Sequence, residues 1–156
     1  MKSRPSGYLV PMQTIERTIS VPTPLATVWD YLVDFTNSEE WDPPTKSTTR
    51  LEGDGGVGTV YRNVSRILGN DVETDYTVAE VEPHRTFRLK GENSSMKLHD
   101  TITFAGDEAG TTITYRAEFQ PTGAAKLVEP LLPLGLKRLG DNTADQLEEC
   151  LRRLSA

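Results

Sequence analysis

Residues 57–78, VGTVYRNVSRILGNDVETDYTV, hold two runs of alternating polar and apolar side chains on either side of Gly69-Asn70. A Gly-Asn pair between two such runs is typical of a two-residue β-hairpin turn. A turn of this length sets the register, so Arg66 is expected opposite Glu73. The stretch therefore predicts two long antiparallel strands, 57–68 and 71–82, whose directly opposed residues share a face of the sheet.

The two faces of this hairpin differ in composition. The face expected to meet water is mostly charged or polar and carries Arg62, Val64, Arg66, Glu73, Asp75 and Thr77. The other face is half polar, whereas a core that only packs is built from Leu, Ile, Val and Phe. Hydroxyls and an amide among apolar groups suit the wall of a ligand cavity. The alternative is a sheet face partly open to water. The half-polar face consists of Tyr61, Asn63, Ser65, Ile67, Val72, Thr74, Tyr76 and Val78.

The rest of the chain predicts more strands and three helices. Thr23 is a candidate N-cap and Pro24 suits the first position of a helix that runs to about residue 34. A short second helix is expected over 37–41, and a long helix over 123–154 carries a leucine-rich stripe. Strands followed by a helix indicate an α+β fold, in which a curved antiparallel sheet of six to seven strands covers the last helix. The other strands expected from alternation are 13–21, 45–52, 85–91, 95–105 and 111–120.

Composition limits the classes of function. The 156 residues fit one domain, 13–156, preceded by an N-terminal extension, 1–12. A net charge of −6 argues against a nucleic-acid partner. One cysteine, Cys150, and two histidines show no zinc-binding spacing, so we expect no metal and no cofactor. The apolar run at 8–10 is too short for a signal peptide, and no run approaches the roughly 18 residues of a membrane span. We therefore expect a cytoplasmic protein without stable membrane insertion.

Several short motifs resemble a known family in their order and spacing. They are Val21–Pro24, Val28–Asp34, Trp41, Gly56–Thr59, Tyr76–Arg85, Thr103-Phe104, Gly110–Thr112 and the leucine-rich final helix. Over about residues 13 to 154 the chain resembles the START-like SRPBCC superfamily, in its polyketide cyclase/dehydrase and lipid transport branch. The resemblance implies a helix-grip fold, with an apolar cavity between the sheet and the C-terminal helix. Family members bind lipids, polyketides, hormones and other apolar molecules, and some are cyclases or dehydratases.

Alternation along the strands and the final helix nominates residues that would line such a cavity. Tyrosine hydroxyls and the amide of Asn63 could orient a carbonyl or hydroxyl group of a ligand. The alternative is that the tyrosine rings pack the core with their hydroxyls at its edge. The candidate ligand-binding residues are Tyr61, Asn63, Ser65, Thr74, Tyr76, Phe87, Leu89, Leu98, Ile102, Phe104, Tyr115, Phe119, Leu139, Thr143 and Leu147.

Asp100 is the candidate catalytic residue, because it is in register with an otherwise apolar set on its strand, Met96, Leu98, Ile102 and Phe104. A carboxylate there is costly unless it is paired or protonated, and a carboxyl with a raised pKa can serve as a general acid or base. Two alternatives remain. A β-bulge could turn Asp100 outward, or Asp100 could pair with Arg17, a charge on the apolar side of the first strand.

Three functions follow from these features. The leading prediction is transport, storage or sensing of a small hydrophobic or amphipathic ligand, such as a lipid or polyketide. The second is a polyketide cyclase or dehydratase that uses acid and base groups in the cavity, so the sequence leaves enzymatic activity uncertain. The third is an interaction module that uses the apolar segment 127–136, and a homodimer is left open.

Overall fold

The computed structural model describes residues 13–122 and 132–155. The predicted extension 1–12 and most of the 127–136 segment lie outside the described residues. The first strand is followed by three short helical elements, then six strands and a long helix. In chain order the elements are β1 (Gln13–Val21), α1 (Leu25–Val33), the 3₁₀ turn η1 (Phe35–Asn37), α2 (Ser38–Trp41), β2 (Thr45–Glu52), β3 (Val60–Ile67), β4 (Asn70–Glu82), β5 (Thr86–Glu92), β6 (Met96–Asp107), β7 (Gly110–Pro121) and α3 (Leu132–Arg153).

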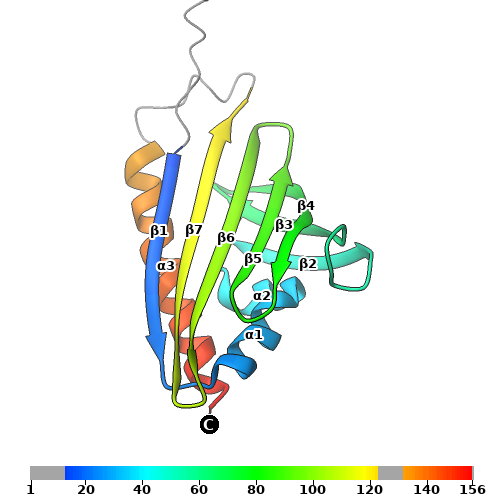
Figure 1. The fold of residues 1–156 in the computed structure, drawn as a ribbon. Helices are drawn as coiled ribbons and strands as arrows, with labels where there is room; N and C mark the ends of the chain where they lie inside the picture. The colour runs from blue at the N-terminus through cyan, green and yellow to red at the C-terminus, as the bar shows by residue number, and fades with distance from the viewer. Residues whose placement is uncertain (1–12, 123–131, 156) are drawn as a thin grey trace, which may run out of the picture.

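The seven strands form one antiparallel sheet in the order β1-β7-β6-β5-β4-β3-β2. In Figure 1, α3 runs lengthwise behind β1 and β7, while β2, β3 and β4 turn away from that end of the sheet. This arrangement confirms the predicted α+β helix-grip fold. Among the helices described, none is long and apolar enough to cross a membrane.

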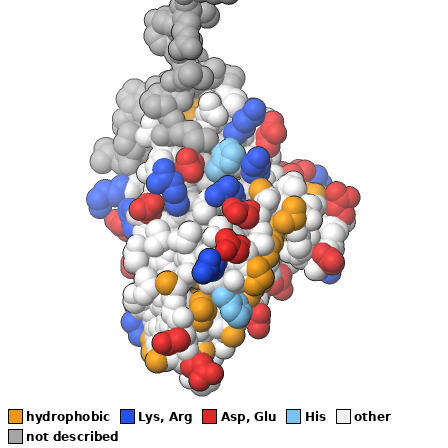
Figure 2. All heavy atoms as spheres, viewed as in Figure 1, with side chains coloured by type: hydrophobic (Ala, Val, Ile, Leu, Met, Phe, Trp, Pro, Cys, Tyr) orange, Lys and Arg blue, Asp and Glu red, His pale blue; other side chains and the backbone are white. Residues whose placement is uncertain are grey.

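The outer face of the sheet is charged, as the alternation predicts. Positive and negative side chains are interspersed over this face (Figure 2), and several pair across neighbouring strands. Arg62 on β3, for example, donates two hydrogen bonds to Asp75 on β4, at 2.9 and 3.1 Å. Exposed pairs of this kind contribute little stability each. They indicate a solvated surface.

The β3–β4 turn differs from the prediction. Ile67 pairs with Asn70 and Arg66 with Asp71, so the two turn residues are Leu68 and Gly69, not Gly69 and Asn70. Leu68 and Gly69 have φ angles of 52° and 81°, and a type I′ turn requires positive φ at both central positions. The predicted pairing of Arg66 with Glu73 is therefore wrong. The register moves by an even number of residues, so the predicted division into two faces still holds.

Thr23 is not an N-cap, because its side chain has another partner. It is fully buried, and its hydroxyl donates to the carbonyl of Leu151 at 2.6 Å. That carbonyl lies in the last turn of α3, where its backbone donor is the N–H of Leu154 at 3.3 Å. Thr23 therefore ties the start of α1 to the C-terminal turn of α3, and Pro24 takes the N-cap position.

Aromatic side chains from the short helical elements fill the space above β3 and β4. Phe35 packs edge-on against Trp41, Tyr61 and Tyr76, with ring centroids 6.2, 5.6 and 5.1 Å apart. Edge-to-face pairs in this range are favourable beyond the area that they bury. The apolar stripe of α3 completes the core through its buried members, Leu136, Leu147, Cys150 and Leu151.

Candidate functional site

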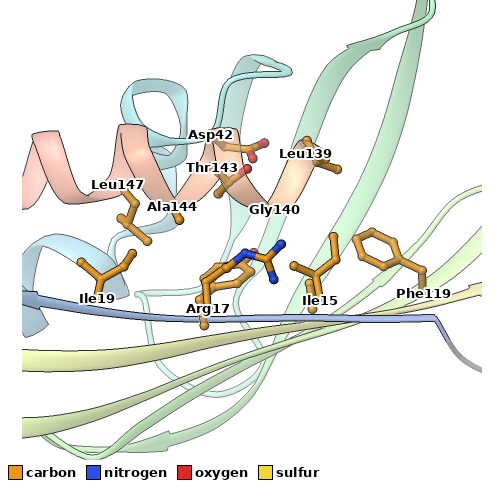
Figure 3. A pocket seen from close by; sticks show the side chains of 12 residues that line it. Ile15, Arg17, Ile19, Asp42, Phe119, Leu139, Gly140, Thr143, Ala144 and Leu147 are labelled. Atoms are coloured by element: carbon orange, nitrogen blue, oxygen red, sulfur yellow. The ribbon is translucent and has the colours of Figure 1, made fainter. Parts of the chain in front are cut away.

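A cavity of about 50 Å³ lies between β1 and β7 on one side and α3 on the other (Figure 3). One buried water molecule needs about 10–15 Å³ of cavity volume. The cavity therefore has room for only a few water molecules. Most of its wall is apolar, with Arg17, Asp42, Tyr115 and Thr143 as the polar exceptions. The lining residues are Ile15, Arg17, Ile19, Asp42, Tyr115, Ala117, Phe119, Leu139, Gly140, Thr143, Ala144 and Leu147.

The predicted ligand-binding residues divide into three groups. Five of them line the cavity: Tyr115, Phe119, Leu139, Thr143 and Leu147. Eight others belong to the packed interior, with at most a small exposed fraction: Tyr61, Thr74, Tyr76, Phe87, Leu89, Leu98, Ile102 and Phe104. The remaining two, Asn63 and Ser65, form part of a hydrogen-bond network beside β2.

Three polar side chains on the β3–β4 face, those of Asn63, Ser65 and Thr74, have partners within the protein. Asn63 donates to the hydroxyls of Thr45 and Thr48, at 2.8 and 3.0 Å, and accepts from Ser65 at 2.6 Å. Thr74 accepts from Asn93 at 2.9 Å. These bonds satisfy buried polar groups without a ligand. A role for these residues in ligand binding stays a prediction.

Asp100 is buried and hydrogen-bonded to the cavity wall. Its Oδ2 accepts from the Tyr115 hydroxyl at 2.7 Å, and its side chain is 5% exposed. Burial raises the pKa of Asp100 to about 7; the Tyr115 hydrogen bond opposes this shift and the nearby charge of Asp42 adds to it. The strand pairings around Asp100 are regular, so it is not turned outward by a bulge.

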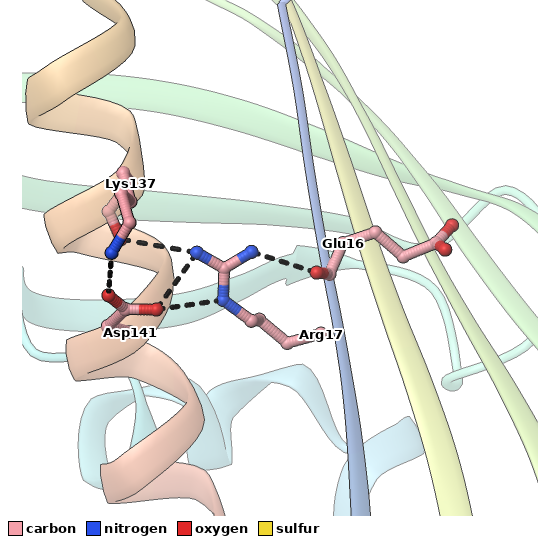
Figure 4. Close-up of polar contacts among 4 residues, drawn as sticks. All are labelled: Glu16, Arg17, Lys137 and Asp141. Atoms are coloured by element: carbon pink, nitrogen blue, oxygen red, sulfur yellow. Dashed lines mark hydrogen bonds and ion pairs between the residues drawn. The ribbon is translucent and has the colours of Figure 1, made fainter.

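The predicted alternative of an Arg17–Asp100 ion pair is wrong, because Arg17 pairs with α3. Its Nε donates to Oδ1 of Asp141 at 3.0 Å, and its Nη2 lies 2.9 Å from the same oxygen (Figure 4). Two backbone carbonyls, of Glu16 and Lys137, also accept from the guanidinium, at 2.8 and 3.3 Å. Arg17 therefore bridges β1 and α3 along one side of the cavity.

Asp42 is a cavity residue that the sequence did not nominate. It follows α2, is half-buried, and its Oδ2 accepts from the Thr45 hydroxyl at 2.6 Å. Burial raises its pKa to about 6, partly offset by that hydrogen bond. It lies between Trp41 and two prolines, outside any periodic segment, so no pattern assigned it a face. Its position directly after Trp41, one of the residues that carry the family resemblance, was the one available signal.

The described residues offer no metal centre, since no three His, Cys, Asp or Glu side chains among them lie close enough together to hold an ion. What the cavity does offer is chemistry for small organic molecules. Asp42 and Asp100 have pKa values of about 6 and 7, so each can donate or accept a proton near neutral pH. Arg17 supplies a permanent positive charge at the cavity wall.

Comparison with known proteins agrees with this fold. Residues 12–152 match the family described as polyketide cyclase / dehydrase and lipid transport. The match covers most of the chain, which therefore belongs to that family. No curated protein sequence matches the chain closely enough to count as a relative.

Solved structures of the same architecture share little sequence with the chain. The Zhui aromatase/cyclase from Streptomyces sp. R1128 is 17% identical over 93% of this chain and 96% of its own, with a TM-score of 0.79. Ara h 8.0201 is 18% identical over 90% and 97%, with a TM-score of 0.67. A START superfamily protein from Mycobacterium smegmatis is 14% identical over 88% and 98%, with a TM-score of 0.67. At these identities the likeness supports the fold alone.

Proposed function

We propose that the chain binds a small hydrophobic or amphipathic molecule between the sheet and α3. The observation that carries this proposal is the cavity between β1, β7 and α3, which combines apolar walls with a few polar groups. Such a combination is typical of ligand pockets, where the apolar wall supplies affinity and the polar groups supply orientation. The family match adds support, because the family description includes lipid transport.

We infer that α3 moves when a ligand enters the cavity. A space of about 50 Å³ is too small for a lipid or a polyketide. Small residues, Gly140 and Ala144, face the sheet where α3 crosses the cavity, and Leu139 and Thr143 beside them are only partly buried. Displacement of this part of α3 enlarges the cavity with the loss of few large apolar contacts.

The first experiment is mass spectrometry, under denaturing conditions, of whatever small molecule is purified with the protein from its native host. A stoichiometric lipid or aromatic compound supports the proposal and identifies the ligand class. The variant Ala144→Met adds bulk to the cavity wall and should abolish co-purification. The matched control Asp145→Met adds the same side chain at an exposed position of α3 and should leave co-purification unchanged. Equal ligand content in both variants would contradict the proposed binding site.

A polyketide cyclase or dehydratase activity is the second candidate, and the Asp100–Tyr115 hydrogen bond favours it. Tyr115 lines the cavity, and Asp100 has a pKa near 7, which suits a general acid or base at neutral pH. In this scheme Tyr115 contacts the substrate and exchanges its proton with Asp100. Assays with polyketide-like substrates should show turnover that Asp100→Asn and Tyr115→Phe both remove. Turnover that survives in both variants would refute this role.

The other functional predictions made from the sequence stay predictions. An interaction surface at 127–136 lies mostly outside the described residues, and Leu136 within it is buried. Transport, storage and sensing are alternative uses of one binding site. A homodimer, a cytoplasmic location and the absence of a nucleic-acid partner each need their own experiment.

A further inference from the structure

We propose that Arg17 binds the anionic head group of the ligand, so that the cavity selects an amphipathic carboxylate over a neutral molecule of the same shape. In this view Asp141 occupies the position of the ligand's carboxylate until the ligand arrives. The inference rests on the proposed ligand-binding function and extends it by naming the ligand class.

The first argument is the position of Arg17. It lies on the inner face of β1 between Ile15 and Ile19, and all three side chains line the cavity. Directly across on β7 it faces Tyr115, another cavity residue. The Arg17 side chain is only 30% exposed, and partial burial of a charged side chain carries a desolvation cost that an aliphatic residue would not. Arg17 places a positive charge beside an apolar cavity despite this desolvation cost. Such a charge is suited to bind a negatively charged group of a ligand.

The second argument is the geometry of the ion pair. Both contacts from Arg17 go to one oxygen of Asp141, Oδ1, at 3.0 Å from Nε and 2.9 Å from Nη2. The other oxygen, Oδ2, accepts from Lys137 at 3.0 Å (Figure 4). Asp141 therefore does not form the two parallel bonds that a carboxylate can make with a guanidinium. A ligand carboxylate that approaches Arg17 in the plane of the guanidinium can form both parallel hydrogen bonds, one to each of its oxygens.

The third argument is that Asp141 can leave easily. Its side chain is 49% exposed, and that of Lys137 is 73% exposed. Ion pairs at this exposure contribute little stability, so Asp141 can turn into water and keep Lys137 as its partner. Two cations and one carboxylate give this site a formal charge of +1, which attracts an anion.

The fourth argument concerns orientation. Asp42 approaches the cavity from the side of α3, whereas Arg17 approaches it from the sheet (Figure 3). A negative head group is repelled by Asp42 when that carboxyl is ionised, and is attracted by Arg17. The head group should therefore stay at Arg17, with the apolar tail against Ile15, Phe119 and Leu139.

The fifth argument is the glycine opposite Arg17. A Cβ at Gly140 would lie 3.0 Å from Nη2 of Arg17 and 2.6 Å from Cγ2 of Ile15. Glycine inside a helix costs about 1 kcal/mol relative to alanine. Here it leaves the space that the guanidinium occupies between β1 and α3. The local packing of α3 is thus adapted to this arginine.

The test compares octanoate with 1-octanol, which have tails of the same length and differ in charge, by isothermal titration calorimetry. The wild-type protein should bind octanoate more tightly. Arg17→Gln should weaken octanoate binding about tenfold, the loss expected for one charge-assisted contact, and change octanol binding by less than about twofold. Asp141→Asn removes the competitor and should tighten octanoate binding several-fold without an effect on octanol. Arg138→Gln, an exposed neighbour on α3, is the matched control and should change neither.

The outcomes separate this inference from the function on which it rests. If octanol binds, and the affinity for octanoate is unchanged in both Arg17→Gln and Asp141→Asn, the proposed head-group site is wrong. The proposed ligand binding would still be supported. If octylamine binds more tightly than octanoate, the predicted sign of the charge is wrong. If none of the three probes binds to the wild-type protein, the proposed binding function itself fails. Should Arg17→Gln not fold, the Asp141→Asn comparison still decides, because Asp141 lies on the surface.

Discussion

Replacement of Asp100 by asparagine should make the stability of the protein less dependent on pH. Asp100 is buried, and burial raises its pKa from 3.8 to about 7. Below pH 3.8 the carboxyl is protonated in both the folded and the unfolded chain, so its ionisation does not affect folding. Between pH 3.8 and about 7 the unfolded chain releases the proton and the folded chain keeps it, which destabilises the fold as the pH rises.

The structure sets the expected size of this effect. The interval from 3.8 to about 7, at about 1.36 kcal/mol per pH unit, corresponds to roughly 4 kcal/mol of stability lost by pH 8. Asparagine has nearly the same size, and its side-chain oxygen can still accept from the Tyr115 hydroxyl. The free energy of unfolding of Asp100→Asn minus that of the wild type should therefore rise by roughly 4 kcal/mol between pH 4 and 8. Urea denaturation at several pH values, followed by tryptophan fluorescence, measures this difference.

Asp75 provides a control of opposite sign. The hydrogen bond from Arg62 lowers the pKa of Asp75, so its contribution is present at neutral pH and is lost as the pH falls through the lowered pKa. Because Asp75 lies on the surface, Asp75→Asn should cost about 1 kcal/mol or less at pH 7. If the Asp100→Asn and wild-type stabilities run parallel across pH 4 to 8, the reasoning about the buried carboxyl is refuted.

Urea denaturation of four more variants tests the packing. Leu68→Asn should stabilise the protein by about 1 kcal/mol, because Asn tolerates the φ of 52° and Leu68 is 95% exposed; a loss would contradict the type I′ turn. Thr23→Val should cost about 0.5–1.5 kcal/mol, since it removes the shorter of the two hydrogen bonds that the Leu151 carbonyl accepts. Leu147→Ala should cost about 2–5 kcal/mol, and a negligible cost would contradict its full burial. Gly140→Ala should destabilise despite its better helix propensity, because its Cβ meets β1; stabilisation would show that α3 lies farther away.

Sequence periodicity predicted the faces of the β3–β4 hairpin correctly and its turn incorrectly. Alternation reports on which side of the sheet a residue lies, and an even register shift does not change that. The turn prediction rested on the Gly69-Asn70 pair, a typical two-residue turn signal, and leucine is unfavourable at positive φ. The structure accepts Leu68 at φ 52°, with its side chain in water. Pairing over the full length of both strands outweighs this local preference.

Polar residues on the inner face of the sheet predicted the ligand-binding site less well than alternation predicted the two faces. Asn63 and Ser65 looked like ligand contacts because a polar group in a core needs a partner. The partners of Asn63 are the hydroxyls of Thr45 and Thr48 on β2, and the partner of Ser65 is the side-chain oxygen of Asn63. Alternation cannot show whether a partner lies on a neighbouring strand or in a ligand. Arg17 was noticed as an exception on β1 for the same reason, and its partner Asp141 lies 124 residues away on α3.

The two halves of α3 are attached to the sheet by different means, and this difference bears on where a ligand can enter. The C-terminal half is fixed by apolar burial, with Leu147 and Leu151 fully covered, and by the hydrogen bond from Thr23. The half that lines the cavity has partly buried side chains and is joined to β1 through Arg17 and Asp141, an ion pair that water can replace. A polar attachment is lost at less cost than a packed one when α3 moves. If the protein binds a ligand here, the ion pair that Arg17 gives up to bind the head group is therefore also the attachment that must open to admit the tail.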